Sequence, residues 1–304
     1  MSSRTNPNIV VLMGGHSFER AVSLSSGREC AAALRSEGFK VKELDARAEL
    51  AIDLVKLAPD IVFNALHGRW GEDGCVQGML EWLKIPYTHS GILASSLAMD
   101  KQRSKAAFRA AGLPVADSFL APCSEIVQKH PMDPPYVVKP NNEGSSCGIF
   151  FVHEVASEPV RLHDNLSGEM MVERYVKGRE LTTTVMGNKA LGVTEIITQG
   201  WYDYDAKYKV GGSKHMVPAD VPTGIQHACN EFALRAHNAL GCRGVSRTDF
   251  RWDDEQGLKG LHLLETNTQP GMTPTSLSPE QAAAKGIEFS KFCRWILEDA
   301  SCQR

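Results

Sequence analysis

The spacing of apolar residues changes near residue 112. Before that point, short apolar runs alternate with segments in which apolar residues recur every three or four positions. These two spacings are typical of buried strands and of amphipathic helices. The predicted strands are Asn8–Met13, 41–44, 60–65 and the short 85–87, and the predicted helices are about 23–37, 75–84 and 101–111. Strands that alternate with helices favour a parallel sheet covered on both faces, so the first third is predicted to be α/β.

After Gly112-Leu113-Pro114, apolar runs follow one another without long helical segments between them. The predicted strands here are Tyr136–Lys139, 149–152, 170–174, 180–186 and 190–197. Gly187-Asn188 predicts a tight hairpin turn between the last two, so this part is expected to be antiparallel and α+β. A helix at 225–240 then precedes the strands Val245–Trp252 and 261–266, which the polar turn 253–257 connects; the tail from Pro279 is predicted to be helical.

Composition narrows the function classes. The 304 residues, 42% hydrophobic and 23% charged, suit a globular protein of two or three packed lobes. A net charge of −3 provides no basic field for nucleic acid or an anionic membrane, so neither is expected as a partner. The apolar run Ile9 to Met13 is too short for a signal peptide or a membrane span. The eight cysteines include no C-x-x-C pair, which favours free thiols and a cytoplasmic protein.

Polar side chains share one face on each of two strands near the carboxyl end. Arg247 and Asp249 are two residues apart, as are Glu265 and Asn267, and side chains two apart on a strand point the same way. If the two strands pair, three oxygen donors meet beside a guanidinium group, which suits Mg²⁺ shared with a phosphate. Taken alone, a solvated strand face with ordinary surface charges explains the pattern better.

The segment 136–148 is the second candidate. Lys139 ends an apolar strand and is followed by a loop with two glycines and two serines, whose backbone N–H groups could surround phosphate oxygens. The loop does not have the spacing of a P-loop, and an ordinary hairpin loop is an equal alternative. The segment 172–180 could present backbone groups to an adenine and a carboxylate to a ribose, but by itself a surface hairpin explains it better.

The loops after the first and third predicted strands are further candidates. Gly14-Gly15 opens the first loop without G-x-G-x-x-G spacing, which argues against a dinucleotide site. Ligands nevertheless bind at the carboxyl ends of strands in α/β sheets, where Glu19 and His67 lie. The alternatives are a structural histidine and a glutamate that interacts with the dipole at a helix start.

Seven strings in this order resemble the D-alanine–D-alanine ligase family of the ATP-grasp superfamily. They are LMGGHSFERAVSL (12–24), ALHGRWGEDG (65–74), AMDKQRSK (98–105), VKP (138–140), EGSS (143–146), YDYDAKY (202–208) and ETNTQPGMT (265–273). The resemblance implies an ATP-grasp fold that follows an amino-terminal parallel-sheet domain. It divides the chain into a substrate-binding domain (1–97), a central subdomain (98–184) and a carboxy-terminal subdomain with the metal site and a lid loop (185–304).

The resemblance also implies a role for each site residue. The residues expected to bind ATP are Lys101 and Lys139 at its phosphates, Glu173 and Val176 at its adenine and Glu180 at its ribose. The residues expected to bind two Mg²⁺ or Mn²⁺ ions are Asp249, Glu265 and Asn267. Glu19, in a network with Ser145 and Tyr208, is expected to receive the ammonium group of the first D-alanine. The residues expected around the second D-alanine are His67, Lys207, Arg247, Ser276 and Leu277, with Arg247 and the Gly271 N–H as the oxyanion hole.

The chain departs from the family pattern at three positions. Ala21 stands where many members have a second Glu, Gln269 where some have Ser, and Cys147 where an aliphatic residue is common. None of the three removes a group that the chemistry needs. The segment 199–218, rich in Tyr, Lys and Gly, is expected to close over the site as a lid.

The implied activity is ligation of two D-alanines through a D-alanyl phosphate, for peptidoglycan precursors. The resemblance implies a homodimer and leaves activation by a monovalent cation open. The alternatives are a D-alanine–D-serine or D-alanine–D-lactate ligase and a non-catalytic nucleotide-binding regulator. Lys207-Tyr208 disfavours an ester-forming ligase, since relatives of that type lack this tyrosine; a regulator would be expected to have lost a metal ligand or Arg247.

Overall fold

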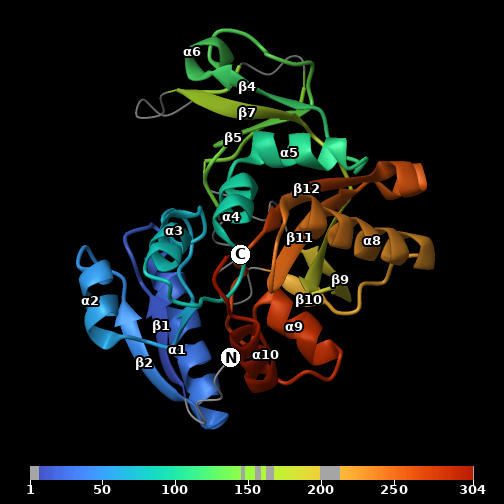
Figure 1. Ribbon diagram of the computed structural model, residues 1–304. Helices are drawn as coiled ribbons and strands as arrows, with labels where there is room; N and C mark the ends of the chain where they lie inside the picture. The colour runs from blue at the N-terminus through green and yellow to red at the C-terminus, as the bar shows by residue number, and fades with distance from the viewer. Residues whose placement is uncertain (1–6, 145–147, 155–158, 162–167, 199–212, 304) are drawn as a thin grey trace.

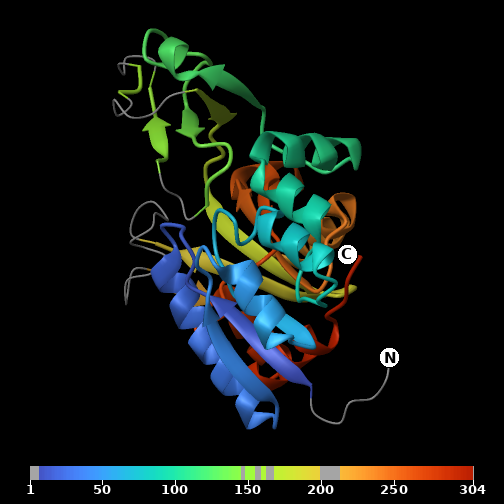
Figure 2. The ribbon, with the colours of Figure 1, turned by 60° about the vertical axis from the view of Figure 1, so that its left-hand side comes forward.

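The computed structural model describes residues 7–144, 148–154, 159–161, 168–198 and 213–303. Those residues form three sheets: a parallel sheet near the amino terminus and two antiparallel sheets (Figure 1). The five-stranded sheet lies between the other two, which are at opposite ends of the molecule (Figure 2). This is the combination of α/β and α+β parts that the apolar spacing predicts. No helix in the described ranges has both the length and the apolar character to cross a membrane.

The parallel sheet has the order β2-β1-β3, with helices on both faces. Its elements are β1 (Asn8–Met13), α1 (Arg20–Ser36), β2 (Lys40–Asp45), α2 (Leu50–Leu57), β3 (Ile61–Asn64) and α3 (Cys75–Trp82). Alternate β1 side chains face opposite ways: Ile9 and Val11 pack in one core cluster with α1, and Val10 packs in another with α2 and α3. A strand buried on both faces requires the unbroken apolar run that β1 has.

The four-stranded sheet has the order β4-β7-β5-β6 and is antiparallel. Its elements are β4 (Ser118–Pro122), α6 (Cys123–Ile126), β5 (Tyr136–Lys139), β6 (Phe150–Val152) and β7 (Glu169–Arg174). Lys139 at the end of β5 is in register with Met171 of β7, which brings it beside Glu173 on the same strand.

The five-stranded sheet has the order β10-β9-β8-β11-β12. Its strands are β8 (Arg179–Met186), β9 (Lys189–Ile197), β10 (Lys214–Met216), β11 (Val245–Trp252) and β12 (Leu261–Asn267), with the 3₁₀ segment η1 (Asp254–Gly260) before β12. The helices around it are α4 (Ile92–Met99), α5 (Lys101–Ala110), α8 (Thr223–Leu240), α9 (Leu277–Ala284) and α10 (Phe289–Glu298). One apolar cluster joins α4, α5 and α8 to this sheet, so the start of α5 is fixed next to β12.

Most predicted elements are confirmed within a few residues, including the hairpin at Gly187, which has a positive φ of 62°. The apolar pattern missed α2, α4, α6 and β4. The predicted strand at 85–87 is wrong, since only Tyr87 makes an isolated bridge to Val62. The end of the predicted lid, 214–216, is the strand β10. The subdomain boundary expected at 184/185 lies inside β8, whose whole length pairs with β11 of the five-stranded sheet.

Candidate active site

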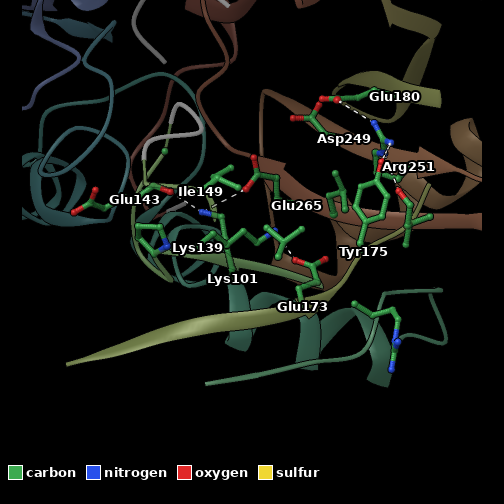
Figure 3. A pocket seen from close by; sticks show the side chains of 16 residues that line it. Lys101, Lys139, Glu143, Ile149, Glu173, Tyr175, Glu180, Asp249, Arg251 and Glu265 are labelled. Carbon is green, nitrogen blue, oxygen red and sulfur yellow. Dashed lines mark hydrogen bonds and ion pairs between the residues drawn. The ribbon is translucent and has the colours of Figure 1, made fainter. Parts of the chain in front are cut away.

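A cavity of about 820 Å³ lies between the four-stranded and five-stranded sheets (Figure 3). All five residues expected to bind ATP line it: Lys101, Lys139, Glu173, Val176 and Glu180. They come from α5, β5, β7, the segment after β7 and β8, so five separate elements converge here. The lysines and the carboxylates line the same cavity. The cavity can therefore bind a ligand that has both an anionic group, for the lysines, and a polar ring system, for the carboxylates.

Lys101 connects this cavity to the neighbouring strands of the five-stranded sheet. Its Nζ donates to the Glu143 carbonyl at 2.6 Å and lies 3.4 Å from Glu265 Oε2 (Figure 3). Its side chain is buried. A buried ammonium group provides a strong point charge for a phosphate.

The residues expected to bind metal lie together on β11 and β12. The two strands pair in antiparallel register, with Asp249 opposite Glu265 and Arg247 opposite Asn267. The Asp249 carboxylate accepts from Thr182 Oγ1 at 2.6 Å and from Asn267 Nδ2 at 3.0 Å. Two carboxylates and an amide oxygen beside a cavity fit Mg²⁺, which takes few protein ligands and completes its octahedron with water or phosphate oxygens.

Arg247 is held in place by the same carboxylate. Its Nε and Nη2 each donate to Asp249 at 2.8 Å, a bidentate pair. Such a pair fixes the plane of the guanidinium group. Arg247 therefore lies next to the expected metal position and also lines a second cavity.

The second cavity, of about 1770 Å³, lies between the amino-terminal loops and the carboxyl end of β12. Six residues expected to bind or activate substrate line it: Glu19, His67, Arg247, Gly271, Ser276 and Leu277. Glu265 and Gly144 line both cavities, so the two sites meet at the carboxylate of Glu265. Ser145, Lys207 and Tyr208 lie outside the described residues.

Hydrogen bonds connect the two amino-terminal loops around Glu19. Ser17 Oγ donates to the His67 carbonyl at 2.7 Å and accepts from the Glu19 N–H at 3.2 Å. Gly68, with φ of 69°, lies so close that a Cβ there would be 2.3 Å from Glu19 Oε2. Only glycine allows this approach at this backbone conformation, and the carboxylate is thereby directed toward the second cavity.

His67 is a buried and neutral imidazole. Its Nε2 lies 3.0 Å from Ser26 Oγ. Burial lowers the pKa of His67 to about 4, and the nearby charge of Arg247 acts in the same direction. A hydrogen bond from the ring to the backbone of Gln269 opposes both effects. The ring therefore adds no positive charge to a cavity that must admit an ammonium group.

Several groups in or behind the cavities were not identified from sequence. Glu72 lines the second cavity, and burial, with the charge of Glu19, raises the pKa of its carboxyl group well above the usual value. Arg251 donates to the Val176 carbonyl at 3.1 Å and lies 3.6 Å from Glu180 (Figure 3). Its spacing of two from Asp249 could have indicated it.

Gln269 is a third group of this kind. Its side chain accepts from Asn64 Nδ2 at 2.8 Å and donates to the Leu66 carbonyl, so it holds the β3 loop against the loop after β12. The sequence indicates it only as a departure from the family pattern, because no local signal predicts a bond to residues about 200 positions away.

Comparisons with known proteins point to one family. Residues 108–298 match the family model described as D-ala D-ala ligase C-terminus, and residues 45–90 match D-ala D-ala ligase N-terminus. The chain is 67% identical over 304 residues to the D-alanine--D-alanine ligase of Ruegeria pomeroyi, covering 100% of this chain and 99% of that one. It is 64% identical to that of Roseobacter denitrificans, covering 100% and 95%. The D-alanine--D-alanine ligase of Bacillus anthracis, solved in complex with ATP, has a TM-score of 0.79 at 30% identity and covers 96% of this chain and 97% of that one.

Proposed function

We propose that this chain, which belongs to the D-ala D-ala ligase family, joins two molecules of D-alanine at the expense of ATP. The observation that carries the proposal is the meeting of two cavities at Glu265. One is lined by lysines and carboxylates suited to a nucleotide, and the other by groups suited to small zwitterions. A phosphoryl group bound in the first can therefore reach a carboxylate bound in the second.

The reaction has two steps. An oxygen of the first D-alanine carboxylate attacks the γ-phosphorus of ATP, and ADP leaves; the product is an acyl phosphate with a good leaving group. The amine of the second D-alanine then attacks the acyl carbon, phosphate leaves, and the amine loses a proton. The product is D-alanyl-D-alanine, a peptidoglycan precursor.

The chain's own cations stabilise the charge that develops in the first step. Lys101 and Lys139 line the nucleotide cavity, and we assign them to the phosphates of ATP. Asp249, Glu265 and Asn267 are the residues that would hold Mg²⁺ or Mn²⁺. When bound, the ions would neutralise charge on the transferring phosphoryl group.

The second step needs an oxyanion site and a proton acceptor. We assign the Gly271 N–H and Arg247 to the oxyanion, because both line the substrate cavity beside Glu265. Ser276 and Leu277 line the same cavity, and with Lys207 they are assigned to the second D-alanine. The Glu19 network and His67 are the groups proposed to take the proton. With its pKa lowered to about 4, His67 is unprotonated at physiological pH but is a weak base, so the Glu19 network is the stronger candidate.

We also propose a cytoplasmic homodimer. Family membership and the availability of ATP in the cytoplasm support this, and exposed apolar side chains such as Trp82 on α3 suit a protein contact. Light scattering of the purified chain measures the oligomeric state.

Product analysis tests the activity. The purified chain is given ATP and Mg²⁺ with D-alanine, D-serine and D-lactate, separately and in pairs, while ADP release and product masses are recorded. We expect D-alanyl-D-alanine with ADP and phosphate in equal amounts. A different dipeptide, an ester or no turnover would refute the assignment.

A further inference from the structure

A lysine lies completely buried behind the nucleotide cavity. Lys105, on α5 one turn after Lys101, has an exposed fraction of 0%, and its Nζ lies 2.8 Å from Glu173 Oε1. Lysine is almost never fully buried unless it is paired, because removing an ammonium group from water is unfavourable. Such a placement requires a reason beyond packing.

Glu173 lies between two lysines that differ in their access to the cavity. Its Oε1 accepts from Lys105, and its Oε2 pairs with Lys139. Lys139 and Glu173 line the cavity (Figure 3). Lys105 is not among the residues that line it. Lys139 can therefore turn toward a bound phosphate, while Lys105 has no route to one.

The charges of the three groups depend on one another. Burial by itself would raise the pKa of Glu173, but the charges of Lys105 and Lys139 lower it to about 2. Burial lowers the pKa of Lys105, and the Glu173 carboxylate opposes that effect. If Lys139 turns to a phosphate, Lys105 is the cation that continues to hold Glu173 in its ionised form.

We propose that Lys105 is a positioning residue that sets the nucleobase specificity of the site by holding Glu173 as an oriented, ionised hydrogen-bond acceptor. This inference rests on the proposed placement of adenine against Glu173. Lys105 does not touch the nucleotide and acts only through the carboxylate.

The chemistry of the base explains why ionisation matters. An ionised carboxylate can only accept hydrogen bonds, whereas a protonated one can also donate. Adenine has an amino group at C6, which donates, and hypoxanthine has a carbonyl oxygen there, which repels a carboxylate. A site built to accept from the amino group therefore rejects inosine triphosphate, because its buried acceptor would remain unpaired.

Lys105→Met tests the inference, because methionine fills a similar volume without charge. The measurement is kcat/KM for ATP and for inosine triphosphate, at saturating D-alanine and Mg²⁺, in the wild type and the variant. We expect the preference for ATP over inosine triphosphate to fall at least about tenfold, the size of a hydrogen bond to a charged group. Lys105→Arg keeps the charge and should retain most of the preference.

Arg109→Met is the matched control. Arg109 is a cation one turn further along α5, and its Nη2 donates to the Ala116 carbonyl at 3.2 Å, away from the cavity. The control should leave the nucleotide preference unchanged, which excludes a general effect of charge loss from this helix.

Equal losses with both nucleotides in Lys105→Met would overturn the inference and leave Lys105 as a structural ion-pair partner. A wild type without preference between the nucleotides would overturn it as well. Lys105→Gln retains an N–H donor in the buried space, so it gives the same comparison if Lys105→Met does not fold. The proposed function fails separately, if the wild type does not ligate D-alanine with ATP.

Discussion

Replacing Glu265 by glutamine tests whether this residue, at which the two cavities meet, binds Mg²⁺. Glutamine has nearly the same shape as glutamate but lacks its charge. Glu265 lies opposite Asp249 in the β11–β12 register and 3.4 Å from Lys101 Nζ. Lys101 also donates to the Glu143 carbonyl at 2.6 Å, a bond that does not involve Glu265, so we expect the fold to persist in the variant.

The size of the effect follows from the lost charge. Two unit charges about 4 Å apart interact with roughly 4 kcal/mol at an effective dielectric constant of 20. Since about 1.4 kcal/mol corresponds to a factor of ten, this equals roughly three orders of magnitude in affinity. The Glu265 side chain is 27% exposed, so solvent screens part of this interaction. We therefore expect the Mg²⁺ concentration for half-maximal activity to rise about 100- to 1000-fold.

The assay is ADP release with D-alanine over a Mg²⁺ titration, with circular dichroism to verify folding. Glu255→Gln is the matched control: Glu255 pairs with Lys177 at the surface, its side chain is 75% exposed, and it lines neither cavity. This control should titrate like the wild type. If folded Glu265→Gln has wild-type turnover at limiting Mg²⁺, the metal assignment is wrong.

Three further predictions concern substrate binding and titration. Tyr208, outside the described residues, is expected from sequence to help hold the first D-alanine. Tyr208→Phe should therefore raise the KM for that site severalfold without lowering the melting temperature. Unchanged D-alanine kinetics would show that Tyr208 is not part of the site. The pKa of His67 falls from 6.5 to about 4 on folding, so only the unfolded chain gains this proton as pH drops below 6.5. Between pH 7 and 4, the free energy of unfolding should therefore fall less in His67→Gln than in the wild type, and the two falls should differ by at most about 3 kcal/mol. Denaturant melts in which both proteins lose the same stability over this pH range would contradict this. The pKa of Glu72 is raised on folding by burial and by Glu19, so wild-type stability falls as pH rises above the usual 4.5. Glu72→Gln should melt higher than the wild type at pH 7.5 but not at pH 4; a variant that melts lower at pH 7.5 would show that the carboxylate is stabilising there.

The parts of the candidate site that depend on spacing along a single strand could be predicted from the sequence. The two-residue periods of Arg247 with Asp249 and of Glu265 with Asn267 place these side chains on one strand face, and the pairing of β11 with β12 confirms that they meet. The residues assigned to ATP and substrate came from the order of the seven strings. Those among the described residues line the two cavities, although their roles stay predictions.

The parts that the sequence did not predict depend on contacts between distant segments. β4 is short, ends at Pro122 and has only one fully buried residue, so its local pattern is weak, and pairing with β7 forms the strand. Lys105 lies one turn after Lys101, which suggests a shared helix face, yet its partner Glu173 is 68 residues away.

By itself, the sequence determined most of the longer elements in their order, the polar faces of β11 and β12 and, through resemblance, the family. Periodicity reports which face of an element is buried but not which element covers it, so the tertiary structure alone decided the partners of Lys105 and Gln269. It also decided the lowered pKa of His67 and the raised pKa of Glu72, because burial changes the free energy of a charged group only after distant segments have excluded water from it.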